Sequence, residues 1–113
     1  MRIAIFLALC LAFTPAAHAR DLTDAEKAVI ANAMQAKERI PLSAQYRWPT
    51  ITGDRQWWYC GWVDYGSGFV PFEALLFWPP QGDLKDAGIT FVGGREKSPD
   101  EVAKLCRGPG LPL

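Results

Sequence analysis

The fold is decided by residues 57–78, which read WWYCGWVDYGSGFVPFEALLFW. Aromatic and branched residues fill both halves of this stretch, and Gly66-Ser67-Gly68 interrupts it. Such a composition is typical of two antiparallel strands joined by a tight turn. If these three residues form the turn, residues whose numbers sum to 134 lie opposite each other in the hairpin.

Strand alternation then sorts the hairpin side chains into two faces. The first is expected to be a core covered by helices, and it consists of Trp58, Cys60, Trp62, Asp64, Val70, Phe72, Ala74, Leu76 and Trp78. The second is the candidate binding face, and it consists of Trp57, Tyr59, Tyr65, Phe69, Glu73 and Phe77, together with Val63, Pro71 and Leu75. Pro71 cannot donate a hydrogen bond to a neighbouring strand, so a register slip is most expected near residues 70–72. A slip of one residue would exchange the two faces over the rest of the strand.

The second face is too apolar to lie in water, because an antiparallel sheet normally shows polar residues on its uncovered side. Three kinds of cover for this face are possible. The chain itself can supply one, through residues 41–49 or through its Pro/Gly-rich tail. A second copy of the chain can supply another, and a partner protein or glycan stacking on the rings can supply the third.

Helices are predicted before and after the strands. Residues 22–40 have the apolar spacing of a helix, with Thr23 and Glu26 as a capping box. Ser98-Pro99-Asp100-Glu101 begins a short second helix that ends near Cys106. Strands are expected at residues 45–51, 56–65, 69–78 and 89–93. This order predicts an α+β fold, with an N-terminal helix and a short C-terminal helix on one side of a four-stranded antiparallel meander.

The first 19 residues have the features of a secretory signal peptide. Arg2 precedes an uncharged apolar run over residues 3–13, and Ala17-His18-Ala19 places small residues where a signal peptidase cleaves. We therefore expect cleavage after Ala19 and a periplasmic or secreted product without a stable membrane anchor. The remaining chain is predicted to be a single domain over residues 20–107 with a flexible tail over residues 108–113.

Two cysteines remain after this cleavage, Cys60 and Cys106. In an oxidising compartment the default prediction for such a pair is a disulfide. Closing a loop of this length would stabilise a small domain by about 4 kcal/mol in the chain-entropy model.

The mature chain lacks the residues of common catalytic sites. His18 is the sole histidine and leaves with the signal peptide, so no imidazole is left for a nucleophile or a metal. Carboxylate-only hydrolysis stays open, with the candidates Asp64, Glu73, Asp83 and Asp86, although the predicted register puts Asp64 and Glu73 on opposite faces. Losing Arg2 leaves one more acidic than basic residue, which argues against nucleic acid as a partner. We predict no catalytic residue, cofactor or metal, and we do not expect an enzyme.

Three short motifs follow one another along the chain, and they are Pro41-Leu42-Ser43-Ala44-Gln45-Tyr46-Arg47, Cys60-Gly61-Trp62-Val63-Asp64 and Gly68-Phe69-Val70-Pro71-Phe72. In these motifs the chain resembles a group of small exported proteins of Gram-negative bacteria that share D-P-x-S-A-x-F-R, C-G-x-V-N and G-[FY]-x-P-F. The chain departs from the group in having Asp64 where the group has Asn, and in a shorter hairpin loop. The resemblance implies an exported α+β domain and no particular activity.

These features predict a non-enzymatic periplasmic binding or interaction protein that uses the aromatic face. An inhibitor, an immunity-type protein or an accessory of an envelope complex would fit, with an envelope protein or a glycan as partner. One alternative is a structural, self-associating domain in which that face is a homodimer interface. A further alternative is a carboxylate-only hydrolase.

Overall fold

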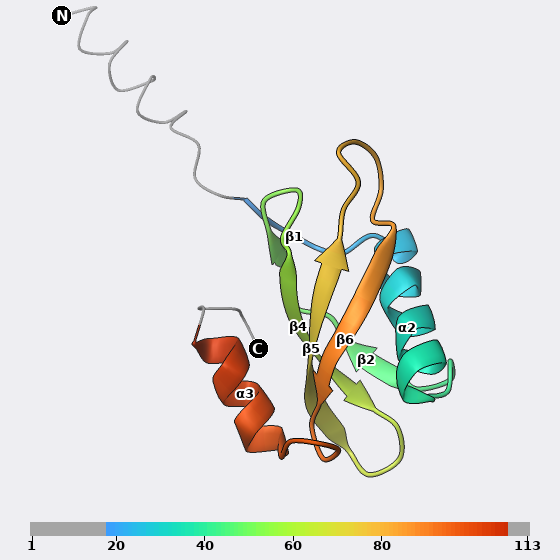
Figure 1. Cartoon of the computed structure of the whole chain (residues 1–113), viewed down its shortest axis with the longest axis vertical. Helices are drawn as coiled ribbons and strands as arrows, with labels where there is room; N and C mark the ends of the chain where they lie inside the picture. Colours follow the sequence, from blue (N-terminus) through green and yellow to red (C-terminus); the bar gives the residue numbers. More distant parts are fainter. Residues whose placement is uncertain (1–17, 109–113) are drawn as a thin grey trace, which may run out of the picture.

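A computed structural model describes residues 18–108 of the chain (Figure 1). Its main sheet is antiparallel and has the order β2-β4-β5-β6. The strands are β2 (Gln45–Arg47), β4 (Trp58–Asp64), β5 (Phe69–Phe77) and β6 (Asp86–Val92), and the helices are α2 (Asp24–Glu38) and α3 (Pro99–Arg107). The predicted α+β class and the four-stranded meander are thus confirmed.

Both helices begin where the sequence predicts. The Thr23 hydroxyl accepts a hydrogen bond from the backbone N–H of Glu26 at 3.1 Å, and the Glu26 carboxylate accepts one from the Thr23 N–H at 2.8 Å. Ser98 and Glu101 form the same reciprocal pair at the start of α3. These capping boxes satisfy backbone N–H groups that the first turn of a helix leaves unpaired.

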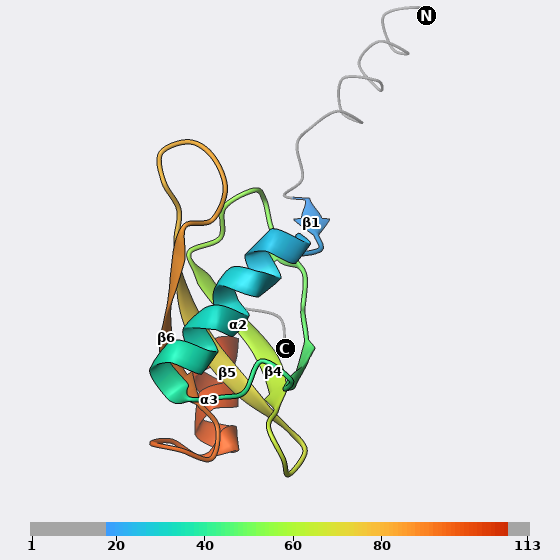
Figure 2. The same ribbon diagram turned by 90° about the vertical axis from the view of Figure 1, so that its right-hand side faces the viewer.

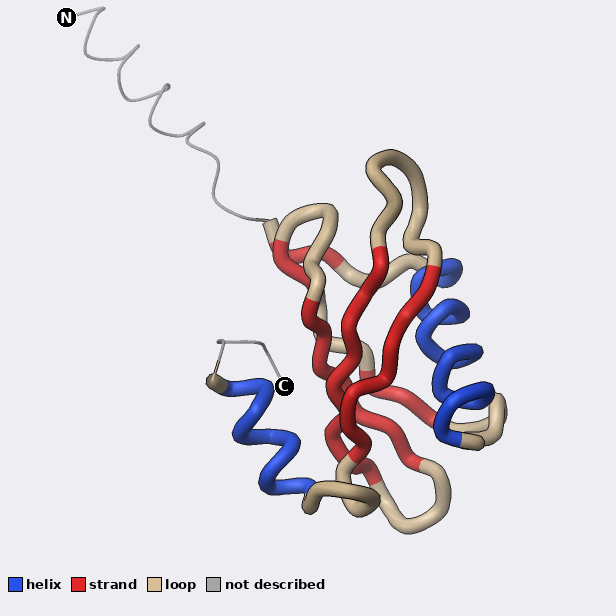
Figure 3. Tube along the Cα trace, viewed as in Figure 1, coloured by secondary structure: helices blue, strands red, loops and turns tan. Residues whose placement is uncertain are grey.

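The two helices lie on opposite faces of the main sheet, which corrects the prediction that both cover one side. In Figure 1, α2 lies on one side of the strands and α3 on the other, and the turned view of Figure 2 places α2 in front of them. The secondary-structure colours of Figure 3 show the same layers, with the strands between the two helices. The fold therefore has a sheet with a helix on each face.

The register of the central hairpin explains this arrangement. Facing residues of β4 and β5 have numbers that sum to 133, as in the pair Cys60 and Glu73, so the predicted register is wrong by one residue. Asp64 sets this register, because its Oδ1 accepts hydrogen bonds from the backbone N–H groups of Gly66 at 3.0 Å and Gly68 at 3.2 Å. The strands consequently end at Asp64 and Phe69, and four residues form the loop. Gly66 and Gly68 both have positive φ, which glycine adopts at little cost.

Compared with the predicted register, the two faces of β5 are exchanged. This exchange does not arise from an irregularity at Pro71. Pro71 is buried and faces Trp62 in an unbroken ladder with β4. The irregularity of β5 lies on its other side, between Glu73 and Ala74, where β6 carries an extra residue. The predicted weak point near residues 70–72 was therefore misplaced, while its predicted consequence, an exchange of faces, is observed.

The α2 face of the sheet holds the main hydrophobic core. Phe72 is fully buried there, and its ring lies over Gly61, where a Cβ would come within 2.8 Å of it. The rest of this core is contributed by both layers, including Ile30, Ala33 and Met34 of α2 and Tyr59, Val63, Ala74 and Leu76 of the sheet. The buried side of α2 also includes Glu26, whereas Ala25 and Ala36, two apolar residues of the same helix, are exposed.

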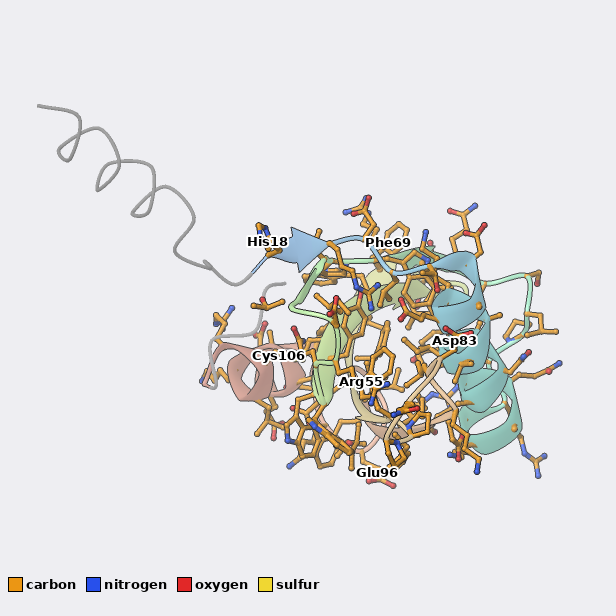
Figure 4. The ribbon with its side chains drawn as sticks, turned by 90° about the horizontal axis from the view of Figure 1, so that it is seen from above. His18, Arg55, Phe69, Asp83, Glu96 and Cys106 are labelled. Atoms are coloured by element: carbon orange, nitrogen blue, oxygen red, sulfur yellow. A yellow bond between two sulfur atoms is a disulfide. The ribbon has the colours of Figure 1, made fainter. Side chains whose placement is uncertain are left out.

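The α3 face holds a smaller cluster built around a disulfide. Cys60 of β4 and Cys106 of α3 are bonded, with their Cα atoms 6.1 Å apart, so the predicted disulfide is confirmed. Figure 4 shows Cys106 between α3 and the sheet. Val102 is buried beside the disulfide and Phe91 packs against it. This cluster fixes α3 to the strands.

The first predicted strand is shorter than expected. It ends at Arg47, and after Pro49 the chain forms β3 (Ile51–Thr52), which pairs with β1 (Ala19–Arg20) in a separate two-stranded sheet. The predicted signal peptide falls mostly on residues 1–17, and all of the predicted tail except Gly108 falls on residues 109–113. Both segments lie outside the described residues.

Candidate functional site

The structure does not bring the predicted binding face together. Tyr59 lies on the α2 face and is 1% exposed, and its hydroxyl donates a hydrogen bond to the carbonyl of Pro49 at 2.6 Å. Burial raises the pKa of this phenol. Tyr65 is half-buried against the same core and donates to the carbonyl of Gly93 at 3.3 Å. Both tyrosines are therefore structural.

Phe69 and Glu73 lie on the α3 face but are already engaged. The guanidinium carbon of Arg47 lies 4.2 Å from the centre of the Phe69 ring, at the hairpin end of the sheet. Glu73 is buried in the layer between the sheet and α3, and this burial raises the pKa of its carboxyl. Glu73 is therefore enclosed, whereas Phe69 is half-buried with Arg47 over its ring.

Two predicted residues, Trp57 and Phe77, are exposed, and the structure adds Trp58. Trp57 is 54% exposed just before β4 begins. Trp58 is 43% exposed and Phe77 is 41% exposed. The sequence predicts Trp58 in the helix-covered core, because Trp58 shares a strand face with Cys60, which must reach Cys106 on the last helix. The Asp64-x-Gly66 pattern was the signal for the longer turn, since Asp commonly binds backbone N–H groups two residues on.

Trp58, Leu75 and Phe77 form an aromatic patch on the α3 face. Trp58 and half-buried Leu75 face each other on β4 and β5, and Phe77 follows two residues later on the same side of β5. Diagonal neighbours of this kind are within reach of aromatic side chains. The Phe77 ring also lies against Gly88 of β6, where a Cβ would come within 3.2 Å of it. The patch thus spans three adjacent strands.

The patch is exposed because α3 covers only one end of this face. α3 begins with Pro99 near Pro71, since both lie within 3.2 Å of the position that a Gly93 Cβ would take. Its other end is tied at Cys106 to Cys60. The next facing pair along both strands is that of Trp58 and Leu75. Figure 1 shows α3 beside the lower half of the sheet, with the other halves of β4 and β5 beyond its C-terminal end.

The disulfide and Glu73 form a cluster of potential metal ligands. The sulfur atoms of Cys60 and Cys106 and a carboxylate oxygen of Glu73 all lie within 4.8 Å of one another. Metals bind cysteine as the thiolate, and both sulfurs here are consumed by their mutual bond. In the oxidised protein this cluster is a disulfide crosslink with the buried carboxyl group of Glu73 beside it.

The other acidic candidates have separate structural environments. Asp64 caps the hairpin turn, and Asp86 accepts a hydrogen bond from the N–H of Ala87 at 2.8 Å. The corrected register puts Asp64 and Glu73 on the same face, but four residues apart, which is about 13 Å along a strand. Two-carboxylate hydrolysis uses carboxyl groups roughly 5 to 10 Å apart across a cleft. Glu73 is buried, whereas Asp83 is exposed in the loop before β6.

One open depression of about 250 Å³ lies on the outer side of α3. It is lined by Lys97, Glu101, Lys104 and Leu105. The Lys97 ammonium lies 4.9 Å from the centre of the Phe91 ring. This depression has mixed charge and one aliphatic side chain, so it lacks the enclosed apolar lining of a typical small-molecule site.

No protein-family model, curated protein or solved structure matches the chain. The resemblance to exported proteins of Gram-negative bacteria therefore stays a prediction. Within residues 18–108, no helix is long and apolar enough to cross a membrane. The disulfide is compatible with a location outside the cytoplasm.

Proposed function

We propose that this is a non-enzymatic binding protein of the bacterial cell envelope, exported by its signal peptide, which contacts a partner protein through the aromatic patch. The observation that carries the proposal is the exposure of Trp58 and Phe77 as neighbours on a face that α3 leaves partly uncovered. Exposed, closely spaced aromatic residues are the usual anchors of protein interfaces.

The surroundings of the patch favour a protein partner over a glycan. Sugar sites combine a stacking ring with polar groups that bind the hydroxyls. Here Leu75 faces Trp58 and precedes Phe77 by two residues on β5, and Gly88 lies against the Phe77 ring, so the patch itself is apolar. Glu73, the carboxylate once expected beside the rings, is buried beneath α3. An apolar side chain of another protein is therefore the better fit.

The positions of the acidic residues support a binding role over a hydrolytic one. The Asp64 carboxylate accepts hydrogen bonds from Gly66 and Gly68 in the hairpin turn, and Glu73 is buried beside the disulfide. Each carboxylate thus has a local structural explanation. A homodimer through the same patch is the competing outcome, and the experiment below separates it.

The test compares capture of envelope proteins by three forms of the mature chain. Trp58→Ser with Phe77→Ser removes both rings, and Leu42→Ser removes another exposed apolar side chain, from the α2–β2 loop, as a control. The wild type and the Leu42→Ser protein are expected to recover a common partner that the double variant loses. Thermal unfolding checks that all three are folded. Equal recovery of partners by all three forms would contradict the aromatic patch as the binding surface. A concentration-dependent dimer that only the double variant abolishes would show that the patch binds a second copy of the chain instead of a partner protein.

A further inference from the structure

The Cys60–Cys106 disulfide and the Glu73 carboxyl group share one buried layer between the sheet and α3. Cys60 and Glu73 face each other on β4 and β5, and Cys106 reaches them from α3 (Figure 4). Cys60 is 2% exposed, Cys106 is 0% exposed and Glu73 is 8% exposed. Both sulfur atoms and a carboxylate oxygen lie within 4.8 Å of one another. Three side chains that can each bind a metal ion thus converge at one enclosed place.

The disulfide leaves the Glu73 carboxyl group without a polar partner. Among residues 18–108, no group donates a hydrogen bond to this carboxyl group and no cation forms an ion pair with it. Burying a carboxylate is costly unless a partner replaces its hydration. A cation bound beside the two sulfurs would supply that partner.

The geometry of the cluster suits zinc once the two cysteines are reduced. Zn²⁺ binds its ligands tetrahedrally, at about 2.3 Å from thiolate sulfur and about 2.1 Å from carboxylate oxygen. These bond lengths place two sulfurs about 3.8 Å apart and each sulfur about 3.6 Å from the oxygen. The three atoms are already within 4.8 Å of one another, and the cysteine Cα atoms are 6.1 Å apart. Rotation of the cysteine side chains can therefore open the site without moving the backbone.

We propose that the dithiol form of the protein binds one Zn²⁺ ion through Cys60, Cys106 and Glu73, and that the disulfide and the metal are alternative states of the same cluster. Each thiol loses its proton on binding, because only the thiolate coordinates the ion. Zn²⁺ accepts no electrons from the thiolates, and its charge offsets two of the three negative charges. Water can occupy the fourth position. The site is independent of the partner that the aromatic patch contacts.

Zinc binding to the reduced mature chain tests the site. The chain is reduced with a phosphine in the absence of oxygen, and its Kd for Zn²⁺ is measured by competition with a chromophoric chelator. One Zn²⁺ per chain is expected. Cys60→Ser with Cys106→Ser, which removes both sulfur ligands, and the oxidised wild type are expected to bind at least about 100-fold more weakly. A reduced wild type that binds Zn²⁺ no more tightly than the serine variant would overturn the site.

Glu73→Gln tests the third ligand. The neutral amide is a weaker zinc ligand than the carboxylate, so the Kd of the reduced chain is expected to rise at least about tenfold. Glu96→Gln makes the same chemical change at an exposed residue between β6 and α3 and is expected to leave the Kd unchanged. Equal Kd values for the wild type and Glu73→Gln would overturn the role of Glu73 as a ligand.

Thermal unfolding separates binding at the folded site from capture of Zn²⁺ by an unfolded chain. Zn²⁺ is expected to raise the Tm of the reduced wild type and to leave the Tm of the serine variant unchanged. If the reduced chain is unfolded without metal, Zn²⁺ is expected to restore the circular dichroism of the folded protein. Binding of Zn²⁺ with neither effect would place the metal on the unfolded chain and would overturn the proposed site.

Oxidation with glutathione disulfide shows whether metal and disulfide use the same sulfurs. The Cys60–Cys106 bond forms while the S–S bond of the reagent breaks and gives two glutathione thiols. The zinc-bound chain is expected to release one Zn²⁺ for each disulfide formed. Disulfide formation that leaves Zn²⁺ bound would contradict the alternative states.

Discussion

The two faces of the sheet are covered in different ways. On one face the 15-residue helix α2 packs on a continuous core, and on the other the 9-residue helix α3 covers a small cluster and is held by a disulfide. At 1.5 Å per residue, α3 is roughly 14 Å long and cannot cover the whole face. The comparison suggests a division of roles in which the α2 face stabilises the fold and the uncovered end of the α3 face is available for contact.

The largest expected effect comes from replacing matched phenylalanines on the two faces. Phe72→Ala removes a fully buried ring that contacts Tyr46, Trp48 and Tyr59 on the α2 face, and it should lower the free energy of unfolding by about 4 kcal/mol. Phe77→Ala removes a ring that is 41% exposed and should cost about 1 kcal/mol or less. Urea unfolding at neutral pH measures both. Equal losses would break the distinction between the faces.

The next effect concerns the disulfide. Replacing Cys60 and Cys106 together by serine opens a loop with a sequence separation of 46 residues and should lower the stability by about 2 to 4 kcal/mol. Because α3 has few other buried contacts, its amide hydrogens should also exchange faster than those of α2. Hydrogen exchange of the double variant checks this. Equal loss of protection in α2 and α3 would mean that the disulfide supports the whole fold.

A smaller effect is expected at the start of α2. Arg20 donates two hydrogen bonds to the Glu26 carboxylate, at 2.8 and 2.9 Å, and these bonds, together with those from Thr23, hold the pKa of Glu26 below its usual value. A lowered pKa means that this stabilisation is present above the unfolded-state pKa, about 4.3, and is lost as the pH falls through the folded-state value. Glu26→Gln should cost about 1 kcal/mol at neutral pH. Denaturant unfolding across pH 7 to 2.5 should show the difference shrinking with acid, and a constant difference would contradict the ion pair.

The smallest effect has the opposite sign and lies under α3. Burial raises the pKa of Glu73, so the folded state favours its protonated form. Its stabilising contribution is complete below the unfolded-state pKa and is lost as the pH rises through the folded-state pKa. The free energy of unfolding of Glu73→Gln should therefore match that of the wild type near pH 3 and exceed it by about 0.5 kcal/mol at neutral pH. A loss of stability at neutral pH would show that the Glu73 carboxylate has a favourable partner.

Local patterns allowed much of the fold to be predicted. The capping boxes at Thr23 and Ser98 depend on residues three positions apart, and the cysteine pair follows from the expected compartment. The four-stranded meander follows from turn residues between apolar runs. The short pairing of β1 with β3 joins two residues on each side, which is too little to leave a periodic signal.

The candidate site could not be predicted correctly, because it depends on one residue of register. Whether the hairpin loop has three or four residues is decided by the Asp64 side chain binding Gly66 and Gly68. Since side chains alternate along a strand, that single residue moved Phe72 to the α2 face and left Glu73 beside Cys60. Trp58 consequently shares the partly covered side with Phe77. Tyr59 is buried for a separate reason, because α2 covers the face of β4 opposite Cys60.

Side-chain footprinting by hydroxyl radicals is the most direct test of which face is open. The protein is a variant that consists of residues 20–108, so that residues 109–113 cannot shield the patch. The account predicts that Trp58, at 43% exposure, is oxidised at least about tenfold faster than its neighbour Tyr59, at 1% exposure. Protection of Trp58 together with rapid oxidation of Tyr59 would mean that the faces are exchanged, and the aromatic patch would not exist.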